Sequence, residues 1–540
     1  MRKIIAVILS VIMLLSITPT VFAGLNKKGK SDIPVILVGG DGDPLYDTDG
    51  NKIFEIDELG EAVSGSSDGN VYEALANIML PFVLEGITFG KWDNYYTNLQ
   101  KELSDMFDKI ICDENGDAKY GTDVSKAHRE SNEFNRQNDK KGTKGYYALN
   151  DYTFYYDWRL DPIQIADELH AYIEDIKKVT NQDEVSLLGR CLGSDVVLAY
   201  IAKYGTDGIH GVGIGATVAN GSEMISEAIS GKFEVDGNAI SRFMTDLDHI
   251  NYVGIEAYLI STVNLLQKSG VLSALTSGKV EEIYYQIVKG ATSALALSTF
   301  LSMPAYWAMV TTEDYEDAML YVFGEEGSEK RTRYAGLIEK IEAYHEIVRL
   351  HVPEIMTEIN DNCNLGITSK YGMQMLPICR SNDVVSDQFA SVRRSSFGAT
   401  TSSIYNTLSD EYIAEREALG LGKYISPDKQ IDASTCMFPD QTWFVKGASH
   451  SKWTDVENTI LYSVIAADEQ LYTSEFSWGQ YMVYSYETKA VSVMDETNCH
   501  TENWEAVKSE DEPQSKSERL FTFLKALFAW LKVIIAKIFG

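Results

Sequence analysis

The residue in this chain best suited to covalent chemistry is a cysteine between two glycines. Cys191 lies in the segment Gly-Arg-Cys-Leu-Gly at residues 189–193, after the apolar residues 185–188 and before the helix-like residues 195–202. A strand, a tight turn and a helix in this order form a nucleophile elbow, here with cysteine in the position usual for serine. The glycines are needed because the strained turn leaves no room for Cβ atoms beside the nucleophile. The segment therefore predicts a nucleophilic thiol.

A thiol nucleophile needs a general base and a group that orients this base. Where a nucleophile elbow is present, the chain order is nucleophile, acid, histidine. His450 is the preferred base because it follows a strand-like segment and a small-residue loop, whereas His500 lies near a polar stretch. Asp383 is the preferred acid, and Asp387 is the reserve. Two alternatives stay open, a surface loop histidine for His450 and an ordinary Asx turn for Asp383.

Two features favour a negative charge on the sulfur of Cys191. The residue is expected at a helix N-terminus, and Arg190 is its direct neighbour. An acyl intermediate would also need two backbone N–H donors for its oxyanion. Leu192, directly after the nucleophile, is expected to supply one of them. Asp41, in the glycine-rich loop that follows the strand-like residues 34–38, is expected to supply the other.

Strand-like and helix-like segments alternate around these residues. Strands are expected at residues 34–38, 152–158, 185–189 and 211–215, and a helix over residues 163–177. This alternation predicts an α/β fold with a mostly parallel sheet flanked by helices. Helical patterns then dominate from about residue 240, so we expect a large cap insertion over the active-site mouth. Sheet-like segments return at residues 373–378 and 442–446.

The pattern divides the chain into six parts. These are a signal peptide at 1–23, the first part of the core at 33–239, a helical cap insertion at 240–370, the second part of the core at 371–504, a polar linker at 505–518 and an amphipathic C-terminal helix at 519–540. Arg2 and Lys3, an apolar run and a Val-Phe-Ala sequence ending at Ala23 are typical of a secretory signal. A secreted, extracellular protein is therefore expected.

The C-terminal segment 519–540 has three lysines in a narrow polar stripe against a wide apolar face. This pattern favours a helix that lies in a membrane interface or docks on a cell-surface partner. The alternative is a final helix packed on the domain. We therefore expect peripheral association with a membrane or the cell surface.

Composition excludes several classes of function. The net charge is −32, with 79 acidic and 47 basic residues, which argues against nucleic acid as a partner. Six cysteines are too few for a disulfide scaffold in 540 residues. No pair of cysteines has C-x-x-C spacing, and the acidic residues 41–51 do not fit an EF-hand, so neither a metal nor a cofactor is expected.

Several of these motifs resemble the lecithin:cholesterol acyltransferase and lysosomal phospholipase A2 group of α/β-hydrolases. The most specific match is Tyr-Asp-Trp-Arg-Leu-Asp-Pro at residues 156–162. Further matches are Pro-Val-Ile-Leu-Val-Gly-Gly-Asp at 34–41, Ser-Met-Pro-Ala-Tyr-Trp at 302–307 and Asn-Asp-Val-Val at 382–385, with His450 in the terminal position. In this chain cysteine replaces the family's nucleophilic serine.

The resemblance implies an α/β-hydrolase fold and an enzyme that cleaves or transfers acyl groups of glycerolipids or related esters. It also makes Trp158 and Trp307 the expected substrate-binding residues. We therefore expect a Cys191–His450–Asp383 triad that forms an acyl-enzyme and passes the acyl group to water or an alcohol. The alternative is a catalytically inactive surface protein of the same fold that binds lipid or a protein partner in the cap cleft.

Overall fold

The computed structural model describes residues 33–40, 45–47, 49–54, 108–122, 152–234, 236–249 and 300–499, with scattered positions between 94 and 124. The expected signal peptide, polar linker and C-terminal helix lie outside these residues, as do Asp41 and residues 250–299 of the expected cap. Within the described part of the chain, none of the helices has the length and apolar character of a membrane span.

The centre of the molecule is an eight-stranded sheet, with the strands in the order β12-β11-β10-β7-β6-β5-β1-β4. Its strands are β1 (Val35–Val38), β4 (Tyr152–Phe154), β5 (Val185–Arg190), β6 (Ile209–Gly215), β7 (Asn364–Tyr371), β10 (Thr442–Lys446), β11 (Tyr481–Ser485) and β12 (Ala490–Val493). Every neighbouring pair is parallel except β11 and β12. The predicted α/β class with a mostly parallel sheet is therefore confirmed.

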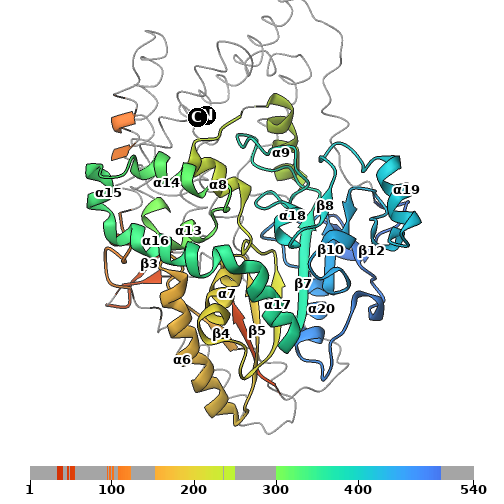
Figure 1. The fold of residues 1–540 in the computed structure, drawn as a ribbon, viewed down its shortest axis with the longest axis horizontal. Helices are drawn as coiled ribbons and strands as arrows, with labels where there is room; N and C mark the ends of the chain where they lie inside the picture. Colours follow the sequence, from red (N-terminus) through yellow and green to blue (C-terminus); the bar gives the residue numbers. More distant parts are fainter. Residues whose placement is uncertain are drawn as a thin grey trace, which may run out of the picture.

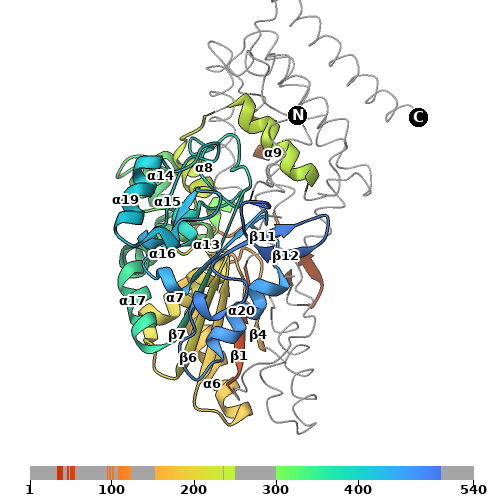
Figure 2. The same ribbon diagram turned by 90° about the vertical axis from the view of Figure 1, so that its right-hand side faces the viewer.

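Different helices cover the two faces of this sheet. Successive side chains of β1 point to opposite faces and show which helices cover each one. Ile36 and Val38 pack in the cluster that includes α6 (Pro162–Thr180) and α7 (Leu192–Tyr204). Val35 and Leu37 pack instead with apolar residues of α20 (Asp455–Ile465). Figure 2 shows α7 and α20 on opposite sides of the strands. Burial on both faces explains why the central strands are continuous apolar runs.

The chain between residue 300 and β7 is mostly helical, with short turns between the helices. It forms α13 (Pro304–Ala308), α14 (Tyr315–Phe323), α15 (Glu329–Arg333), α16 (Ala335–Ile347) and α17 (Val352–Asn362). Figure 1 shows α13 to α16 grouped with α8 (Glu223–Ser230) beside one end of the sheet, while α17 runs back along it.

One strand lies earlier in the chain than the sequence pattern predicts. Residues 373–378 were expected to form a strand, but the strand is β7, at Asn364–Tyr371, and residues 374–378 are irregular. The apolar residues at 373, 375 and 376 are buried without being paired in the sheet. β7 itself contains Thr368, Ser369 and Lys370, all buried, so its sequence lacks the apolar character by which a central strand is recognised.

Candidate active site

Cys191 stands at the sharp turn between β5 and α7, in a backbone conformation that side chains rarely adopt. Its φ is 50° and its ψ is −127°. A Cβ atom on Gly193 would come within 2.1 Å of the carbonyl oxygen of Val38, and one on Gly189 within 2.9 Å of the Cα of Ser194. Both glycines are therefore required sterically, and the strain is of the kind concentrated at functional sites.

Hydrogen bonds from the neighbouring strand and helix hold this turn. The N–H of Cys191 donates to the carbonyl oxygen of Gly215 at the end of β6, at 3.3 Å. The N–H of Ser194 donates to the carbonyl oxygen of Cys191 at 3.0 Å, and the Ser194 hydroxyl also donates to that carbonyl. The same hydroxyl lies 2.6 Å from the hydroxyl of Thr217. The sulfur is thus fixed at the carboxyl ends of the parallel strands.

The imidazole of His450 lies beside this sulfur. His450 comes from the loop after β10, and its Nε2 is 3.1 Å from Sγ of Cys191. Its Nδ1 is 2.7 Å from Oδ2 of Asp387. All three side chains are almost entirely buried, with exposed fractions of 4% for Cys191, 1% for His450 and 0% for Asp387. The structure therefore brings together a thiol, an imidazole and a carboxylate in the order needed for nucleophilic catalysis.

The carboxylate is that of Asp387, and the prediction of Asp383 is wrong. Asp383 is exposed, and its carbonyl oxygen accepts a hydrogen bond from the N–H of Ile404. After β7 the chain folds back so that Met373 pairs with Ser386. This pairing returns residue 387 to the strand end, where His450 lies, and leaves residue 383 on the outer part of the loop.

Asp387 is held as a carboxylate. Burial by itself would raise its pKa, but the charge and hydrogen bond of His450, the N–H of Ala390 and the charge of Lys370 outweigh burial and lower it. A carboxylate only accepts hydrogen bonds, so Nδ1 of His450 must carry the proton of their shared bond. Nε2 is then left to accept the thiol proton of Cys191, or to donate to the thiolate after the transfer.

The backbone and a neighbouring ring fix the orientation of the imidazole. The N–H of His450 donates to the carbonyl oxygen of Asp387 at 2.8 Å. The ring of Phe389 stacks on the imidazole, with ring centres 4.7 Å apart and an interplanar angle of 28°. His450 is therefore tied to the acid loop through both its main chain and its side chain.

The structure describes one of the two expected oxyanion donors. Leu192 is the first residue of α7, directly after Cys191, where N–H groups have no acceptor within the helix. Asp41 lies outside the described residues. Gly39, two residues before Asp41, is anchored, because the Tyr156 hydroxyl donates to its carbonyl oxygen at 2.6 Å.

Trp158 and Trp307 lie in the main hydrophobic core, with exposed fractions of 1% and 3%. The indole N–H of Trp307 donates to the carbonyl oxygen of Leu301 at 3.1 Å, and its ring stacks on Phe323. These are the contacts of packing residues, so the substrate-binding role expected for Trp307 is not supported. Trp158 is likewise enclosed by the core.

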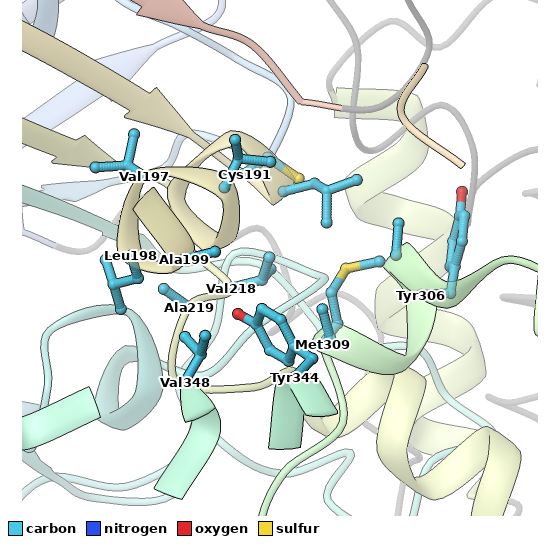
Figure 3. Close-up of a cluster of buried hydrophobic side chains, with 14 of the residues drawn as sticks. Cys191, Val197, Leu198, Ala199, Val218, Ala219, Tyr306, Met309, Tyr344 and Val348 are labelled. Carbon is cyan, nitrogen blue, oxygen red and sulfur yellow. The ribbon is translucent and has the colours of Figure 1, made fainter. Parts of the chain in front are cut away.

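Helix α7, which begins directly after Cys191, is fixed by packing and by a buried polar contact. Figure 3 shows Cys191 at the start of this helix, with Tyr344, Val348 and Met309 of the helical region beside Val218 and Ala219. One turn after Cys191, Oδ1 of Asp195 accepts hydrogen bonds from the Tyr344 hydroxyl at 2.7 Å and from the Arg349 guanidinium at 3.2 Å. Burial, only partly offset by Arg349 and Tyr344, raises the pKa of Asp195 to about 6.

Sequence reasoning missed a group of cations on the other side of the sheet from α7. The guanidinium of Arg190 lies 4.2 Å from the ring centre of Trp453, and the ammonium of Lys370 lies 4.3 Å from it. Arg190 also donates to the side-chain oxygen of Asn458 in α20. Arg190 was singled out only as the neighbour of Cys191 in sequence, and no local pattern pointed to Lys370. Among the described residues, no three His, Cys, Asp or Glu side chains gather as metal ligands would.

Comparisons with known proteins add little to this geometry. No protein-family model and no curated protein matches the chain. A chain in the solved structure titled "The crystal structure of Tle4-Tli4 complex" is similar at 13% sequence identity, over 63% of this chain and 75% of that chain. The TM-score of the match is 0.24. A likeness at that level carries no argument about fold or function.

Proposed function

We propose that this protein is an α/β-hydrolase that cleaves or transfers acyl groups through a Cys191–His450–Asp387 triad. The observation that carries the proposal is the geometry of the three side chains, with 3.1 Å between sulfur and imidazole and 2.7 Å between imidazole and carboxylate. The strained elbow and the two sterically required glycines support a nucleophilic role for the sulfur.

The order of the strands also supports an α/β-hydrolase. The nucleophile follows β5, the acid follows β7 and the histidine follows β10, so the chain order is nucleophile, acid, histidine. The strand β1, whose loop would supply the second oxyanion donor, lies directly beside β5. Its last carbonyl oxygens contact the elbow at Gly193. The end of β1 therefore lies beside the elbow, which supports the proposed role of the following loop in binding the oxyanion.

The reaction follows from these positions. Nε2 of His450 takes the proton of the Cys191 thiol as the sulfur attacks the carbonyl carbon of an ester, and the N–H of Leu192 stabilises the oxyanion. The intermediate collapses to a thioester, and the imidazolium returns its proton to the leaving alkoxide. Water or an alcohol then attacks the thioester and gives up a proton to Nε2, which passes it to the departing sulfur. Asp387 stabilises the imidazolium in both halves of the cycle.

The proposed substrates are acyl esters of glycerolipids or related lipids. This class is supported by the resemblance at residues 156–162 and 302–307, and by the sequence of the segment 519–540, which suits attachment to a membrane surface. We also propose that the protein acts outside the cell, on the basis of its first 23 residues. Flotation of the full chain with phospholipid vesicles, compared with a chain ending at residue 518, tests the membrane association. Equal flotation of the two chains would contradict a role for the segment.

Mass spectrometry of the intact protein after incubation with mixed lipids and short acyl esters tests the proposed reaction. We expect a mass increase equal to one acyl group, located on Cys191 and absent from Cys191→Ala, and ester turnover that iodoacetamide abolishes. Alkylation of Cys191 without any acyl adduct or turnover would contradict catalysis. That result would favour the alternative, a binding protein with the same fold.

A further inference from the structure

Lys370, in β7, has a fully buried side chain directed at the loop that carries His450. Its ammonium nitrogen lies 2.8 Å from the carbonyl oxygen of His450, 2.7 Å from that of Lys452 and 3.4 Å from that of Ser449. An ammonium has three N–H donors. All three are therefore used by the main chain on either side of the imidazole-bearing residue.

Charged groups surround this ammonium. Glu457 places a carboxylate oxygen 4.0 Å from it, and Asp387, Arg190 and Cys191 also act on it electrostatically. Burial lowers the pKa of Lys370, the carboxylates of Glu457 and Asp387 oppose this effect, and Arg190 adds to it. Electrostatic interactions are reciprocal, so a positive charge on Lys370 favours an ionised Asp387 and an ionised Cys191.

Holding a loop with a buried charged side chain has a large desolvation cost. An ion taken out of water loses its hydration, and an apolar side chain of similar size is often tolerated as well or better in its place. The ring of Trp453 and the carboxylate of Glu457 offset part of this cost. The position of the charge therefore points to a role in the chemistry of the neighbouring site as well as in packing.

We propose that Lys370 is a positioning residue for the Cys191–His450 pair. Its three hydrogen bonds fix residues 449–452 so that Nε2 of His450 faces the sulfur, and its charge favours the thiolate formed when the proton moves from Sγ to Nε2. This inference rests on the proposed function for its effect on turnover. Its effect on the reactivity of the thiol does not depend on any ester being a substrate.

The test compares Lys370→Met with the wild-type full-length chain. The rate of alkylation of Cys191 by iodoacetamide is measured by peptide mass spectrometry between pH 5 and pH 9. We expect the midpoint of the pH profile to move upward by about one pH unit and the rate at pH values below the wild-type midpoint to fall about tenfold, since one unit changes the thiolate fraction there by that factor. A folded Lys370→Met protein with the wild-type midpoint and rate would overturn the proposal.

Lys446 provides a matched control. It is a second buried lysine, in the adjacent strand β10, and its ammonium contacts Asp428 at 2.9 Å and Gln430 at 3.4 Å, away from the triad. Lys446→Met should lower the melting temperature by removing the cation that pairs with Asp428, but should keep the wild-type alkylation profile. An equal shift in both variants would show a general effect of losing a buried lysine and would overturn the proposal.

A second variant covers the case in which Lys370→Met does not fold. Lys370→Gln keeps a hydrogen-bond donor without the charge, so its midpoint should also move upward, whereas an unchanged midpoint in the folded variant would overturn the proposal. The two proposals can fail separately. If the wild type turns over no ester but the Lys370 variants still shift the alkylation profile, the acyl-transfer function fails and the positioning role of Lys370 stands.

Discussion

His450 and Asp387 are joined twice, once through side chains and once through the main chain. Nδ1 of His450 donates to Oδ2 of Asp387 at 2.7 Å, and the N–H of His450 donates to the carbonyl oxygen of Asp387 at 2.8 Å. The carboxylate is held in turn by the N–H groups of Phe389 and Ala390 on its other oxygen, at 3.1 and 2.9 Å. The acid therefore fixes the position of the imidazole as well as its protonated nitrogen.

This relationship predicts different outcomes for two aspartates that are four residues apart. Asp387→Asn should lower ester turnover by about 10³- to 10⁴-fold, because an amide no longer stabilises the imidazolium or selects its tautomer. Asp383→Asn should leave turnover within about twofold of wild type, since this side chain is exposed. Steady-state kinetics on a short acyl ester measure both effects. Equal losses in the two variants would contradict the assignment of the acid.

The cysteines should differ sharply in reactivity toward alkylating agents. Burial raises the pKa of Cys112, Cys363 and Cys436 to about 12 and that of Cys379 well above its usual value. These four thiols are therefore protonated at pH 7 and unreactive. We expect iodoacetamide to label Cys191 alone among these five cysteines of the native protein, as measured by peptide mapping. Labelling of the four at rates similar to Cys191 would contradict this expectation.

Gly193 should tolerate no side chain. In Gly193→Ala the new Cβ would lie 2.1 Å from the carbonyl oxygen of Val38. This oxygen belongs to the main chain, so a change of side-chain rotamer cannot relieve the clash. We expect a loss of about 3 kcal/mol in the free energy of unfolding, at the upper end for overpacking, together with a loss of activity. Gly422→Ala is the control, because the nearest atom to its Cβ would be Cγ of the flexible Glu417 side chain, at 3.2 Å, and the Cα of Glu417 would be at an ordinary contact distance of 3.7 Å. Urea unfolding of both variants measures the difference.

Asp195 should make the stability of the protein depend on pH. Its pKa rises from 3.8 to about 6 on folding, so between these values the folded state binds more protons than the unfolded state. The contribution of the group to stability is thus fully present below about pH 4 and is lost as the pH rises through 6. The rise corresponds to about 3 kcal/mol.

The measurement is the difference in unfolding free energy between the wild type and Asp195→Asn at pH 4 and at pH 7. Asparagine keeps an oxygen that can accept from Tyr344 and Arg349 but does not titrate in this range. The wild type should therefore lose most of this contribution, about 2 kcal/mol, relative to the variant between the two pH values. Asp361→Asn, at an exposed position, serves as the control and should show no such change. A constant difference for Asp195→Asn would contradict the role of this group.

The tight turn at Cys191 could be predicted from sequence because its signal is local. An apolar strand, two glycines and a helix are adjacent in the chain, and the structure shows why both glycines are required. His450 was also accessible, since it follows a recognisable strand, β10. Its distance from Cys191 in the chain, 259 residues, could be bridged only by assuming the order of functional groups in a known fold.

The aspartate that contacts His450 could not be identified from sequence in the same way. Asp383 and Asp387 both lie in polar turns after the strand, and the choice depends on the pairing of Met373 with Ser386, which is a tertiary contact. Lys370 was missed for a related reason. A lysine near the end of a strand ordinarily indicates solvent, and its burial is evident only when the loop 449–452 is seen to cover it.

The three groups of the proposed triad follow β5, β7 and β10, and β10 pairs with the sheet through β7. Parallel strands of this kind assemble late, because each pairing closes a long loop before it is stabilised. A refolding intermediate that has docked β1, β5 and β6 would possess the elbow but neither of its partners. Recovery of the reactivity of the Cys191 thiol during refolding should therefore lag behind the return of the far-UV circular dichroism signal. Its rate would report the last step of sheet assembly.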